Sequence, residues 1–515
     1  MPTLGQIIER NASHSPKQLA VVYQDKRYTH LQYAERVKKL ASALYQQGLR
    51  RQDRFSVLAM NCSEYLELCG AAEWAGFILN TINWRLARAE IEAILNDASP
   101  RILFFEEQYA ELVNAMRPQL EGIEQFVCIG RPQNGASCYE SMLESGDAAG
   151  PPIRAHGQDT LCLIYTSGTT GRPKGVIQDN RGYAALSEII SSELKLGGDG
   201  KLLAIAPLFH IGARSLASGQ QWRGGTIVLH RSFDAEEVIR TIERERITAI
   251  HLVPTMVQAL LDAPNLGQHD LSSLRMLMYA AAPMPVPLLK RAMSVFGPIM
   301  HNGFGQTEIN LMSVLYPHQH VLDGTPEQVA RLGSVGQPHP RCEIRIVSED
   351  GSECPPGVSG EITARSETAM VGYWNNSTAT ADTIRDGWVH TGDMGFLDDQ
   401  GYLFLVDRKK DMIITGGENV YSREVEDALL THDSVADVAV IGVPDEKWGE
   451  SVMAIVVLKP GSPVGAQELI AYCKAGIASF KCPRTIQFVE ALPRLPTGKL
   501  NKVELRQQYR KSAES

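Results

Sequence analysis

The feature that most constrains this fold is a buried strand that runs straight into a glycine-rich loop. The apolar residues 161–164 are typical of a buried strand, and residues 165–175 have the sequence YTSGTTGRPKG. Glycines let the backbone bring successive N–H groups close to an anion, and Arg172 and Lys174 add positive charge. The segment therefore predicts a phosphate-binding loop at the end of a strand. Composition alone leaves an ordinary surface loop as the alternative.

The length and charge of the chain limit the classes of protein to which it can belong. Its 515 residues exceed one ordinary core and predict two or more domains, and 44% hydrophobic with 21% charged residues is typical of a globular enzyme. The formal net charge of −9 argues against general nucleic-acid binding. No apolar run is long enough to span a bilayer, and residues 1–17 lack the apolar core of a secretory signal. We therefore expect a cytoplasmic location.

The cysteines and the absent motifs exclude several kinds of site. Nine cysteines are scattered along the chain without a C-x-x-C pair, which fits neither a zinc framework nor a disulfide scaffold. The sequence has no HExxH and no GxSxG, so a zinc peptidase or a serine hydrolase is disfavoured. The glycine-rich segment at 165–175 is not a Walker loop either, because it has no Gly-Lys pair followed by Ser or Thr at the required spacing.

The pattern along the chain predicts a layered α/β organisation. Residues 1–145 alternate helical patterns with short apolar strands, and the same alternation resumes after a Gly- and Pro-rich connector at 145–160. Past residue 330 strands become shorter and turns more frequent, which indicates a small β-rich lobe. The predicted fold class is therefore α/β. It comprises a large N-terminal domain (1–407) of two α/β sheet subdomains plus the β-rich lobe, a hinge at 408–410, and a mobile α+β C-terminal cap domain at 411–515.

Four further motifs carry chemically useful side chains, and each has a structural alternative. Residues 302–308, NGFGQTE, offer a ring for a base and a Thr–Glu pair whose oxygens suit Mg²⁺, or else a turn into a helix. Residues 387–393 end in an aspartate that can accept bonds from ribose hydroxyls or simply form a turn. The charged residues at 407–411 lie where the pattern changes from the β-rich lobe to the C-terminal α+β domain, which suggests a hinge. Residues 495–502 carry a lysine on a glycine turn, which by itself is typical of a surface lysine.

Together with the loop at 165–175, these motifs resemble the successive core motifs of the ANL superfamily in their order and separations. That superfamily comprises acyl-CoA synthetases, peptide-synthetase adenylation domains and luciferases, and the resemblance extends over nearly the whole chain. It implies an AMP-forming acid–thiol ligase that uses ATP, Mg²⁺ and coenzyme A. A carboxylate would attack the α-phosphate of ATP, giving an acyl-adenylate and pyrophosphate, and a thiol would then displace AMP to form a thioester.

The resemblance also implies roles for individual residues. Lys499 would neutralise charge that develops between the carboxylate and the α-phosphate, and Lys410 would be the hinge residue. The implied catalytic residues are Lys499, Thr307, Glu308 and His210, with Glu308 and Thr170 as Mg²⁺ contacts. Contacts to ATP and CoA are implied for Thr166, Ser167, Gly168, Thr169, Thr170, Gly171, Lys174, Ala281, Asn302, Phe304, Asp393, Arg408, Gly416, Gly417, Trp448, Phe480 and Arg484. The implied acid pocket consists of His210, Ile211, Gly212, Tyr279, Ala280, Gly303, Asn310 and Met312.

Departures from the commoner family pattern bear on the acid. Alanines at 280–282 replace frequent glycines, and Phe304 replaces the usual tyrosine. Amino-acid activators of the family carry an aspartate near residues 209–212, and its absence here disfavours an amino acid because an unpaired ammonium would be buried. Small residues at 280–282 and at 303 leave room for a ring or a medium chain. We therefore expect an aromatic or medium-chain acid.

Two alternative functions remain open at this point. A stand-alone adenylating enzyme would load a carrier protein instead of CoA. A nucleotide-binding regulator would have lost catalysis, yet Lys499, Glu308 and Asp393 are all present. The expected partners are a small carboxylic acid, ATP and CoA, and the resemblance is compatible with a homodimer.

Overall fold

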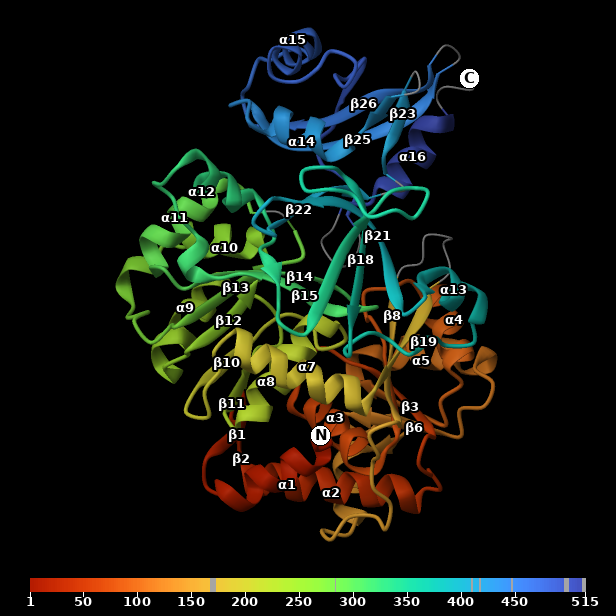
Figure 1. Ribbon diagram of the computed structural model, residues 1–515. Helices are drawn as coiled ribbons and strands as arrows, with labels where there is room; N and C mark the ends of the chain where they lie inside the picture. Colours follow the sequence, from red (N-terminus) through yellow and green to blue (C-terminus); the bar gives the residue numbers. More distant parts are fainter. Residues whose placement is uncertain are drawn as a thin grey trace. The chain divides into compact units, whose positions relative to one another are not determined.

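The computed structural model divides into two compact units that are described here one at a time. It describes residues 1–166, 173–282, 284–408, 411–415, 418–445, 448–494 and 500–511. The first unit comprises Met1–Ile344 and Ala364–Val389, and the second comprises Arg345–Thr363 and His390–Ser515. Figure 1 shows their helices and strands, many of them labelled.

The first unit contains a nine-stranded sheet whose six inner strands are parallel. Apart from β14, whose sequence is MHNGFGQ, these strands are mostly apolar runs, as expected where both faces of a parallel sheet are covered. Antiparallel strands close both edges of the sheet. The order is β16 (Gln337–Pro338), β15 (Asn310–Leu315), β14 (Met300–Gln306), β13 (Met276–Ala280), β12 (Ala249–Leu252), β10 (Lys201–Ala204), β11 (Thr226–Leu229), β1 (Leu19–Tyr23) and β2 (Lys26–Thr29).

An eight-stranded sheet in the same unit carries the glycine-rich loop. Its strands β8 and β9 form an antiparallel hairpin, and residues 167–172 between them lie outside the described part of the chain. The order is β19 (Gly372–Tyr373), β9 (Lys174–Asp179), β8 (Thr160–Thr166), β4 (Ile78–Thr81), β3 (Arg54–Leu58), β5 (Ile102–Glu106), β6 (Gln125–Ile129) and β7 (Ser137–Cys138). The predicted strand before the loop is thus confirmed as β8.

Two helices, α7 (Asn180–Glu193) and α8 (Ile211–Arg223), lie in the layer between these sheets. Helix α7 contacts β8 and β9 of one sheet and β15 of the other, while α8 contacts β10 and β11. The two helices approach closely because α8 is rich in small residues: a Cβ at Gly219 would meet Ile190 at 2.7 Å. Ser187 also donates a hydrogen bond to Ser218 across the contact (2.9 Å).

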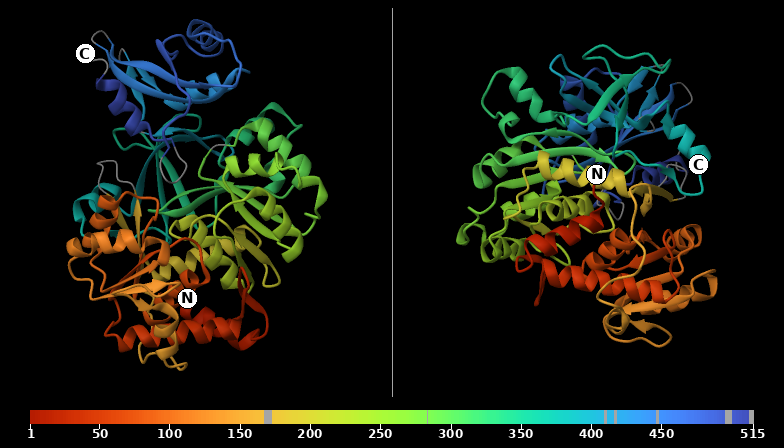
Figure 2. Two further views of the ribbon diagram at one scale, coloured as in Figure 1. Left: turned by 180° about the vertical axis from the view of Figure 1, so that it is seen from behind. Right: turned by 60° about the horizontal axis from the view of Figure 1, so that its bottom comes forward.

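Of the remaining helices, α1, α2, α3 and α6 share the buried core of α7 and α8, whereas α9, α10 and α11 pack on the other face of the nine-stranded sheet and α4 and α5 on the other face of the eight-stranded sheet. Helices α1, α2 and α3 pack on one another, and α1 and α2 lie side by side in Figures 1 and 2. The helices are α1 (Leu4–His14), α2 (His30–Gln46), α3 (Ser63–Ala75), α4 (Arg88–Ala98), α5 (Ala110–Met116), α6 (Tyr139–Ser145), α9 (Ala235–Glu245), α10 (Pro254–Leu261), α11 (Val286–Phe296), α12 (Pro326–Ala330) and α13 (Ser377–Thr383).

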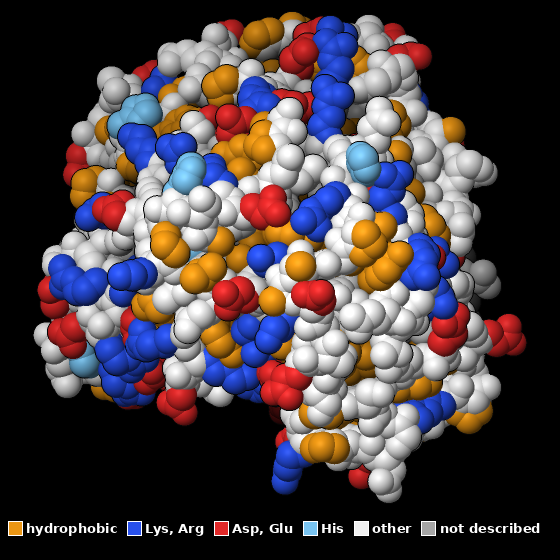
Figure 3. Space-filling view, turned by 90° about the horizontal axis from the view of Figure 1, so that it is seen from below, with side chains coloured by type: hydrophobic (Ala, Val, Ile, Leu, Met, Phe, Trp, Pro, Cys, Tyr) orange, Lys and Arg blue, Asp and Glu red, His pale blue; other side chains and the backbone are white. Residues whose placement is uncertain are grey.

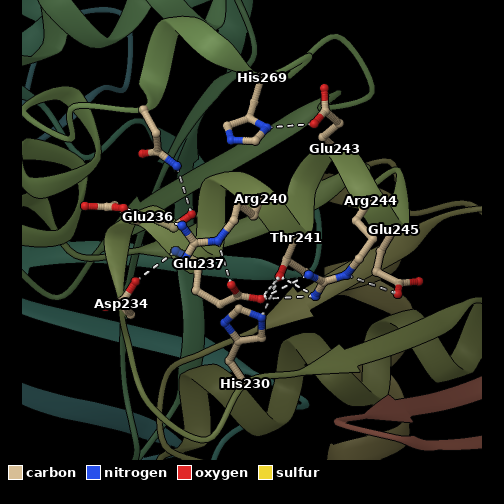
Figure 4. Close-up of polar contacts among 11 residues, drawn as sticks. His230, Asp234, Glu236, Glu237, Arg240, Thr241, Glu243, Arg244, Glu245 and His269 are labelled. Carbon is tan, nitrogen blue, oxygen red and sulfur yellow. Dashed lines mark hydrogen bonds and ion pairs between the residues drawn. The ribbon is translucent and has the colours of Figure 1, made fainter.

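Helix α9 has an apolar inner face and an outer face whose charged side chains pair with one another. Its inner residues Val238, Ile239 and Ile242 are fully buried, whereas its outer face carries ion pairs that Figure 4 shows. Glu237 accepts hydrogen bonds from Arg240 (2.9 Å) and Arg244 (3.2 Å), which lie one and two turns along the helix. These exposed pairs contribute little stability each. On the face drawn in Figure 3, Lys and Arg side chains likewise lie interspersed with Asp and Glu.

The predicted β-rich lobe is a five-stranded sheet whose strands are divided between the two units. Its order is β17 (Cys342–Val347), β18 (Gly360–Ser366), β21 (Trp388–Leu397) and β20 (Ile384–Arg385), with β22 (Leu403–Arg408) paired to β21. The two compact units change over after residues 344 and 389. The domain boundary near 407 stays a prediction. Residues 409 and 410 lie outside the described part of the chain, so the hinge at 408–410 stays a prediction.

The second unit contains a mixed sheet covered by helices on both faces. Alternate residues of β25 and β26 face two separate cores, one shared with α14 and α15 and the other with Leu505 of α16. Its strands are β24 (Glu418–Val420), β23 (Ile413–Thr415), β26 (Gly449–Leu458), β25 (Val435–Asp445) and β27 (Thr485–Phe488), and its helices are α14 (Ser422–Leu430), α15 (Ala466–Gly476) and α16 (Lys502–Lys511). The predicted α/β fold class, with a smaller α+β unit at the C-terminal end, is confirmed. Among the described residues, none of the helices combines the length and apolarity needed to cross a membrane.

A buried ion pair joins α2, α3 and α6 in the first unit. The Glu67 side chain is 0% exposed, and both of its oxygens accept hydrogen bonds from Arg36 (2.7 and 3.1 Å). The hydroxyl of Tyr139 donates to Glu67 Oε2 at 2.7 Å. Burial raises the pKa of Glu67, and the hydrogen bonds and charge of Arg36 oppose this rise. Arg36 therefore stabilises the ionised form of the Glu67 carboxylate.

Replacing Arg36 should therefore destabilise the first unit strongly. We expect Arg36→Met to lower the free energy of unfolding by about 3–5 kcal/mol, because it leaves a buried carboxylate without its cation. Arg88→Met is the matched control, since Arg88 pairs with Glu92 on an exposed face of α4 (46% and 20% exposed) and should change stability by about 0.5 kcal/mol or less. Urea denaturation of both variants tests this, and equal losses would contradict a special role for the buried pair.

Candidate active site

Lys174, Tyr373 and Glu308 come together directly after the glycine-rich loop. Lys174 is the first residue of β9, and its Nζ lies 5.0 Å from the centre of the Tyr373 ring. The Tyr373 hydroxyl donates a hydrogen bond to Glu308 Oε1 at 2.9 Å. Burial, with the nearby charge of Glu308, raises the pKa of Tyr373, so the phenol stays a proton donor. A cation and a carboxylate are thus held on one aromatic side chain beside the loop.

The segment that carries Glu308 is fixed by hydrogen bonds from neighbouring strands. Gln178, on the same face of β9 as Lys174, donates to the carbonyl of Thr307 at 2.8 Å. The backbone N–H of Met370 donates to the carbonyl of Glu308 at 2.8 Å. These bonds hold the Thr307–Glu308 segment, and hence the carboxylate, in one position.

The carboxylate of Glu308 fits the Mg²⁺ expected at this point. It is half-buried, and among the described residues only Oε1 is engaged, by a neutral hydroxyl. Mg²⁺ usually takes one or two carboxylates and completes its shell with waters and substrate phosphates, so a single carboxylate next to a phosphate loop is sufficient. Thr170, the second predicted Mg²⁺ contact, lies outside the described residues. In the part of the chain that the structure describes, no cluster of three or more His, Cys, Asp or Glu residues could hold a metal ion.

Strand β14 presents the predicted nucleotide and acid residues on opposite faces. Asn302 and Phe304 point to one face, where Asn302 donates to the carbonyl of Ser334 (3.2 Å) and Phe304 packs against Ile309 and Met312. Gly303 points to the other face, where a Cβ would collide with the Cε atom of Met278. The residues predicted to contact the nucleotide and the residue predicted to contact the acid therefore lie on opposite faces of β14.

The predicted acid-pocket residues are only partly brought together. Ala280 and Gly303 are register partners in the parallel pair β13–β14 and share one face. Tyr279 faces the opposite side, where its hydroxyl contacts His320 Nε2 at 3.0 Å. Met312 is fully buried in the core beside Phe304 and not beside Gly303.

Asn310, another predicted pocket residue, links three segments of the chain through its side chain. Its side chain is 4% exposed, and its Nδ2 donates to the carbonyl of Thr368 (2.5 Å) and to Gln178 Oε1 (3.2 Å). Its backbone has φ = 67°, in the left-handed region that asparagine tolerates. The residue thus closes the turn after Glu308.

The three predicted pocket residues 210–212 begin helix α8. His210 is the N-cap position, and its ring lies 4.5 Å from that of Phe209 between centroids. Asn61 fixes the preceding segment, because its side chain donates to the carbonyls of Ile205 (3.2 Å) and Ala206 (3.0 Å) and accepts from the Leu208 N–H (2.9 Å). A Cβ at Gly212 would meet nothing within 4 Å, so open space adjoins the helix start.

Ala281, a predicted adenine contact, has a strained backbone. Its φ of 69° lies in the left-handed region, which costs an L-residue with a Cβ roughly 1–2 kcal/mol. Residue 281 is one of the alanines that stand where the family resemblance led us to expect glycine. Such strain is commonly kept at functional sites.

The second unit carries the remaining described predictions. Asp393, 8% exposed, lies in β21 directly opposite the backbone of Arg408 in β22. The guanidinium of Arg484 lies 4.6 Å from the centre of the Trp448 ring, so the structure brings these two predicted CoA residues together. Phe480 is 42% exposed.

Several predicted residues lie in parts of the chain outside the described ranges. These are Ser167, Gly168, Thr169, Thr170, Gly171, Lys410, Gly416, Gly417 and Lys499, together with the side chain of Arg408. Thr166 is the last residue of β8, opposite Lys174 in the hairpin register. The roles implied for all of these residues stay predictions.

The structure also identifies residues that the sequence analysis missed. Tyr373 and Gln178 contact the Thr307–Glu308 segment from strands that flank or follow the loop, and Asn61 fixes the segment before α8. None of them belongs to a recognisable motif. Their roles arise from pairings between segments more than 60 residues apart, which no local sequence signal reveals.

Comparisons with known proteins agree with this geometry. A family model described as AMP-binding enzyme matches residues 8–374, and the model for the C-terminal domain of that family matches residues 424–499. The chain is 36% identical to an indoleacetate–CoA ligase of Aromatoleum aromaticum over 507 residues, covering 98% of each chain. It is also 36% identical to a feruloyl-CoA synthase of an Amycolatopsis species, covering 98% of this chain and 99% of that one.

Among solved structures, the chain is similar to the anthranilate CoA ligase AuaEII in complex with anthranoyl-AMP. The TM-score is 0.90 at 30% identity, with 100% of this chain and 98% of that chain covered. Both domains of the family are present, in the order and with the motifs that the resemblance to the ANL superfamily predicted. The chain therefore belongs to the AMP-binding enzyme family.

Proposed function

We propose that this chain joins a carboxylic acid to coenzyme A in an ATP- and Mg²⁺-dependent reaction, and that the acid is aromatic. The observation that carries the proposal is the placement of Lys174, Tyr373 and Glu308 at the end of the glycine-rich loop. The aromatic acid is supported by relatives named for indoleacetate, ferulate and anthranilate, which are aromatic acids.

The first half-reaction is adenylation. A carboxylate oxygen attacks the α-phosphorus of ATP, the bond to the β-phosphate oxygen breaks, and pyrophosphate leaves with its electron pair. Lys174 lies where it can neutralise phosphate charge, and Glu308, oriented by Tyr373, can hold Mg²⁺. Mg²⁺ when bound supplies charge neutralisation to the leaving phosphates. Positioning and electrostatics then provide most of the rate, as in phosphoryl transfer generally.

The second half-reaction is thioester formation. The thiol of CoA attacks the acyl carbon, loses its proton and displaces AMP, which is a far better leaving group than an oxide ion. Trp448, Arg484 and Phe480 are proposed to contact CoA, since the first two already form a cation–π pair and the third is exposed. Asp393 and Arg408 are proposed to bind the ribose.

A carrier protein is the second candidate for the thiol. One relative, 34% identical over 518 residues, is named fatty acid–[acyl-carrier-protein] ligase. Measuring AMP release with CoA against a phosphopantetheinyl carrier protein separates the two. A cytoplasmic location and a homodimer belong to the proposal as well; the nine cysteines, all free, fit a reducing compartment.

Removing the hydroxyl of Tyr373 tests the proposed Mg²⁺ and phosphate site. We expect Tyr373→Phe to lower kcat/KM for acid-dependent pyrophosphate release by about tenfold and to raise the Mg²⁺ concentration for half-maximal rate, because Glu308 loses one hydrogen bond. Tyr316→Phe is the matched control, since the Tyr316 hydroxyl also binds a glutamate, Glu193. Identical Mg²⁺ curves for both variants would count against the assignment.

Replacing Lys499 tests the assigned role in adenylation. Lys499→Ala should reduce acid-dependent pyrophosphate release by about 10²–10³-fold, as expected when one transition-state donor is lost. Thioester formation from supplied acyl-adenylate should be retained. Both rates are measured on the same preparation, and equal loss of the two half-reactions would contradict the role.

A proline at position 410 tests the hinge. Lys410→Pro fixes the φ angle of the residue at which the C-terminal domain is proposed to rotate between the half-reactions. We expect pyrophosphate release to persist while thioester formation falls by at least about tenfold. Overall turnover equal to that of the unsubstituted enzyme would overturn the hinge assignment.

A further inference from the structure

A row of three side chains crosses the nine-stranded sheet on the face that carries Ala280 and Gly303. His251 of β12 is the register partner of Met278 in β13, and Met278 is the partner of His301 in β14. Register partners in a parallel sheet point to the same face, and residues two positions apart on one strand do so as well. The three side chains therefore share the face of the predicted acid residues.

That face looks toward helix α8. Met278 belongs to the same buried core as Leu216 of α8, and Ile211 packs against this core. His251 lies level with Met278, two residues before Ala280, which corresponds to about 7 Å along the strand. Space is open beside Gly212, at the start of the same helix, α8.

His251 differs from the other buried histidines of this sheet region. Neither of its ring nitrogens has a hydrogen-bond partner among the described residues, although both are buried. In His301 only Nε2 lacks a partner, because Nδ1 lies within 3.1 Å of the Ile299 carbonyl, and both nitrogens of His320 have partners. A buried polar group left unpaired carries a desolvation cost, so an unpaired imidazole indicates a missing partner.

A neutral partner suits the buried imidazole of His251. Burial alone lowers the pKa of His251 to about 4, so the imidazole is neutral near pH 7 and offers one donor and one acceptor. A second carboxylate or an ammonium on the acid would be buried here without a counter-charge. A hydroxyl or a ring N–H has no such cost and can pair with either nitrogen.

We propose that His251 is a specificity-determining residue that hydrogen-bonds a neutral hydroxyl or ring N–H group carried by the acid. This inference rests on the proposed function and narrows its substrate class to aromatic acids with such a group. Met278 makes room for the ring, since its flexible thioether side chain lies over Gly303 and can move aside.

The test compares paired acids of similar shape, of which only one carries the hydrogen-bonding group. Suitable pairs are ferulate against 3,4-dimethoxycinnamate, and indole-3-acetate against 1-naphthaleneacetate. The readout is kcat/KM for acid-dependent pyrophosphate release, which does not depend on the thiol acceptor. We expect the enzyme to prefer the polar member of at least one pair by about tenfold, the value of one neutral hydrogen bond.

In His251→Leu this preference should disappear, through a loss with the polar acid and an unchanged or higher kcat/KM with its partner. His320→Leu is the matched control: it removes a buried histidine from the opposite face of the sheet and should leave the ratio unchanged. If His251→Leu does not fold, His251→Gln is measured instead, and its ratio should lie between one and that of the unsubstituted enzyme.

Two results would overturn the inference. One is a preference ratio at or below one for both pairs in the unsubstituted enzyme. The other is an equal loss with both members of a pair in the folded His251 variants, which would make the residue merely structural. Failure of every acid, including medium-chain acids, to release pyrophosphate would contradict the proposed function itself and remove the inference with it.

Discussion

The hydrogen bond from Gln178 to the carbonyl of Thr307 is the contact on which the rest of the active site depends. Gln178 lies on β9, the strand that follows the glycine-rich loop, and Thr307 follows β14 of the other sheet. One buried amide therefore ties the phosphate-loop hairpin to the segment that carries Glu308. Lys174 and Gln178 share a face of β9, so the hairpin sets the position of the cation and of the carboxylate together.

The alternation of side chains along β14 determines on which face of the strand each substrate would bind. On β14, Asn302 and Phe304 face one side while Gly303 faces the other, beside Ala280. A nucleotide on one face and an acid on the other would approach the same strand end, where Glu308 is held. Strand β14 would thus lie between the two substrates. Because Gly303 has no side chain, the acid could approach the backbone of this strand closely.

The sequence predicted the fold class, the strand before the loop and the small β-rich sheet, because periodicity and turn residues act locally. It could not predict which residues of a motif share a face. Tyr279 and Ala280 are adjacent in one predicted pocket stretch, yet Tyr279 points into the opposite core and binds His320. Asn310 likewise matches a pocket position but closes a turn. Tyr373 and Gln178 escaped notice since their roles come from pairing between distant segments.

The strained Ala281 connects these observations. An alanine at φ = 69° is destabilised relative to glycine in the folded state, whereas glycine would lose more conformational freedom on folding. The two effects oppose each other, so the choice of residue changes rigidity more than stability. A Cβ at 281 restricts the backbone directly after Ala280, at the end of the strand that positions the acid face. The face of the sheet that carries Ala280 and Gly303 would then be held in one arrangement. This rigidity suits a pocket in which His251 forms a hydrogen bond with a single polar group of the acid.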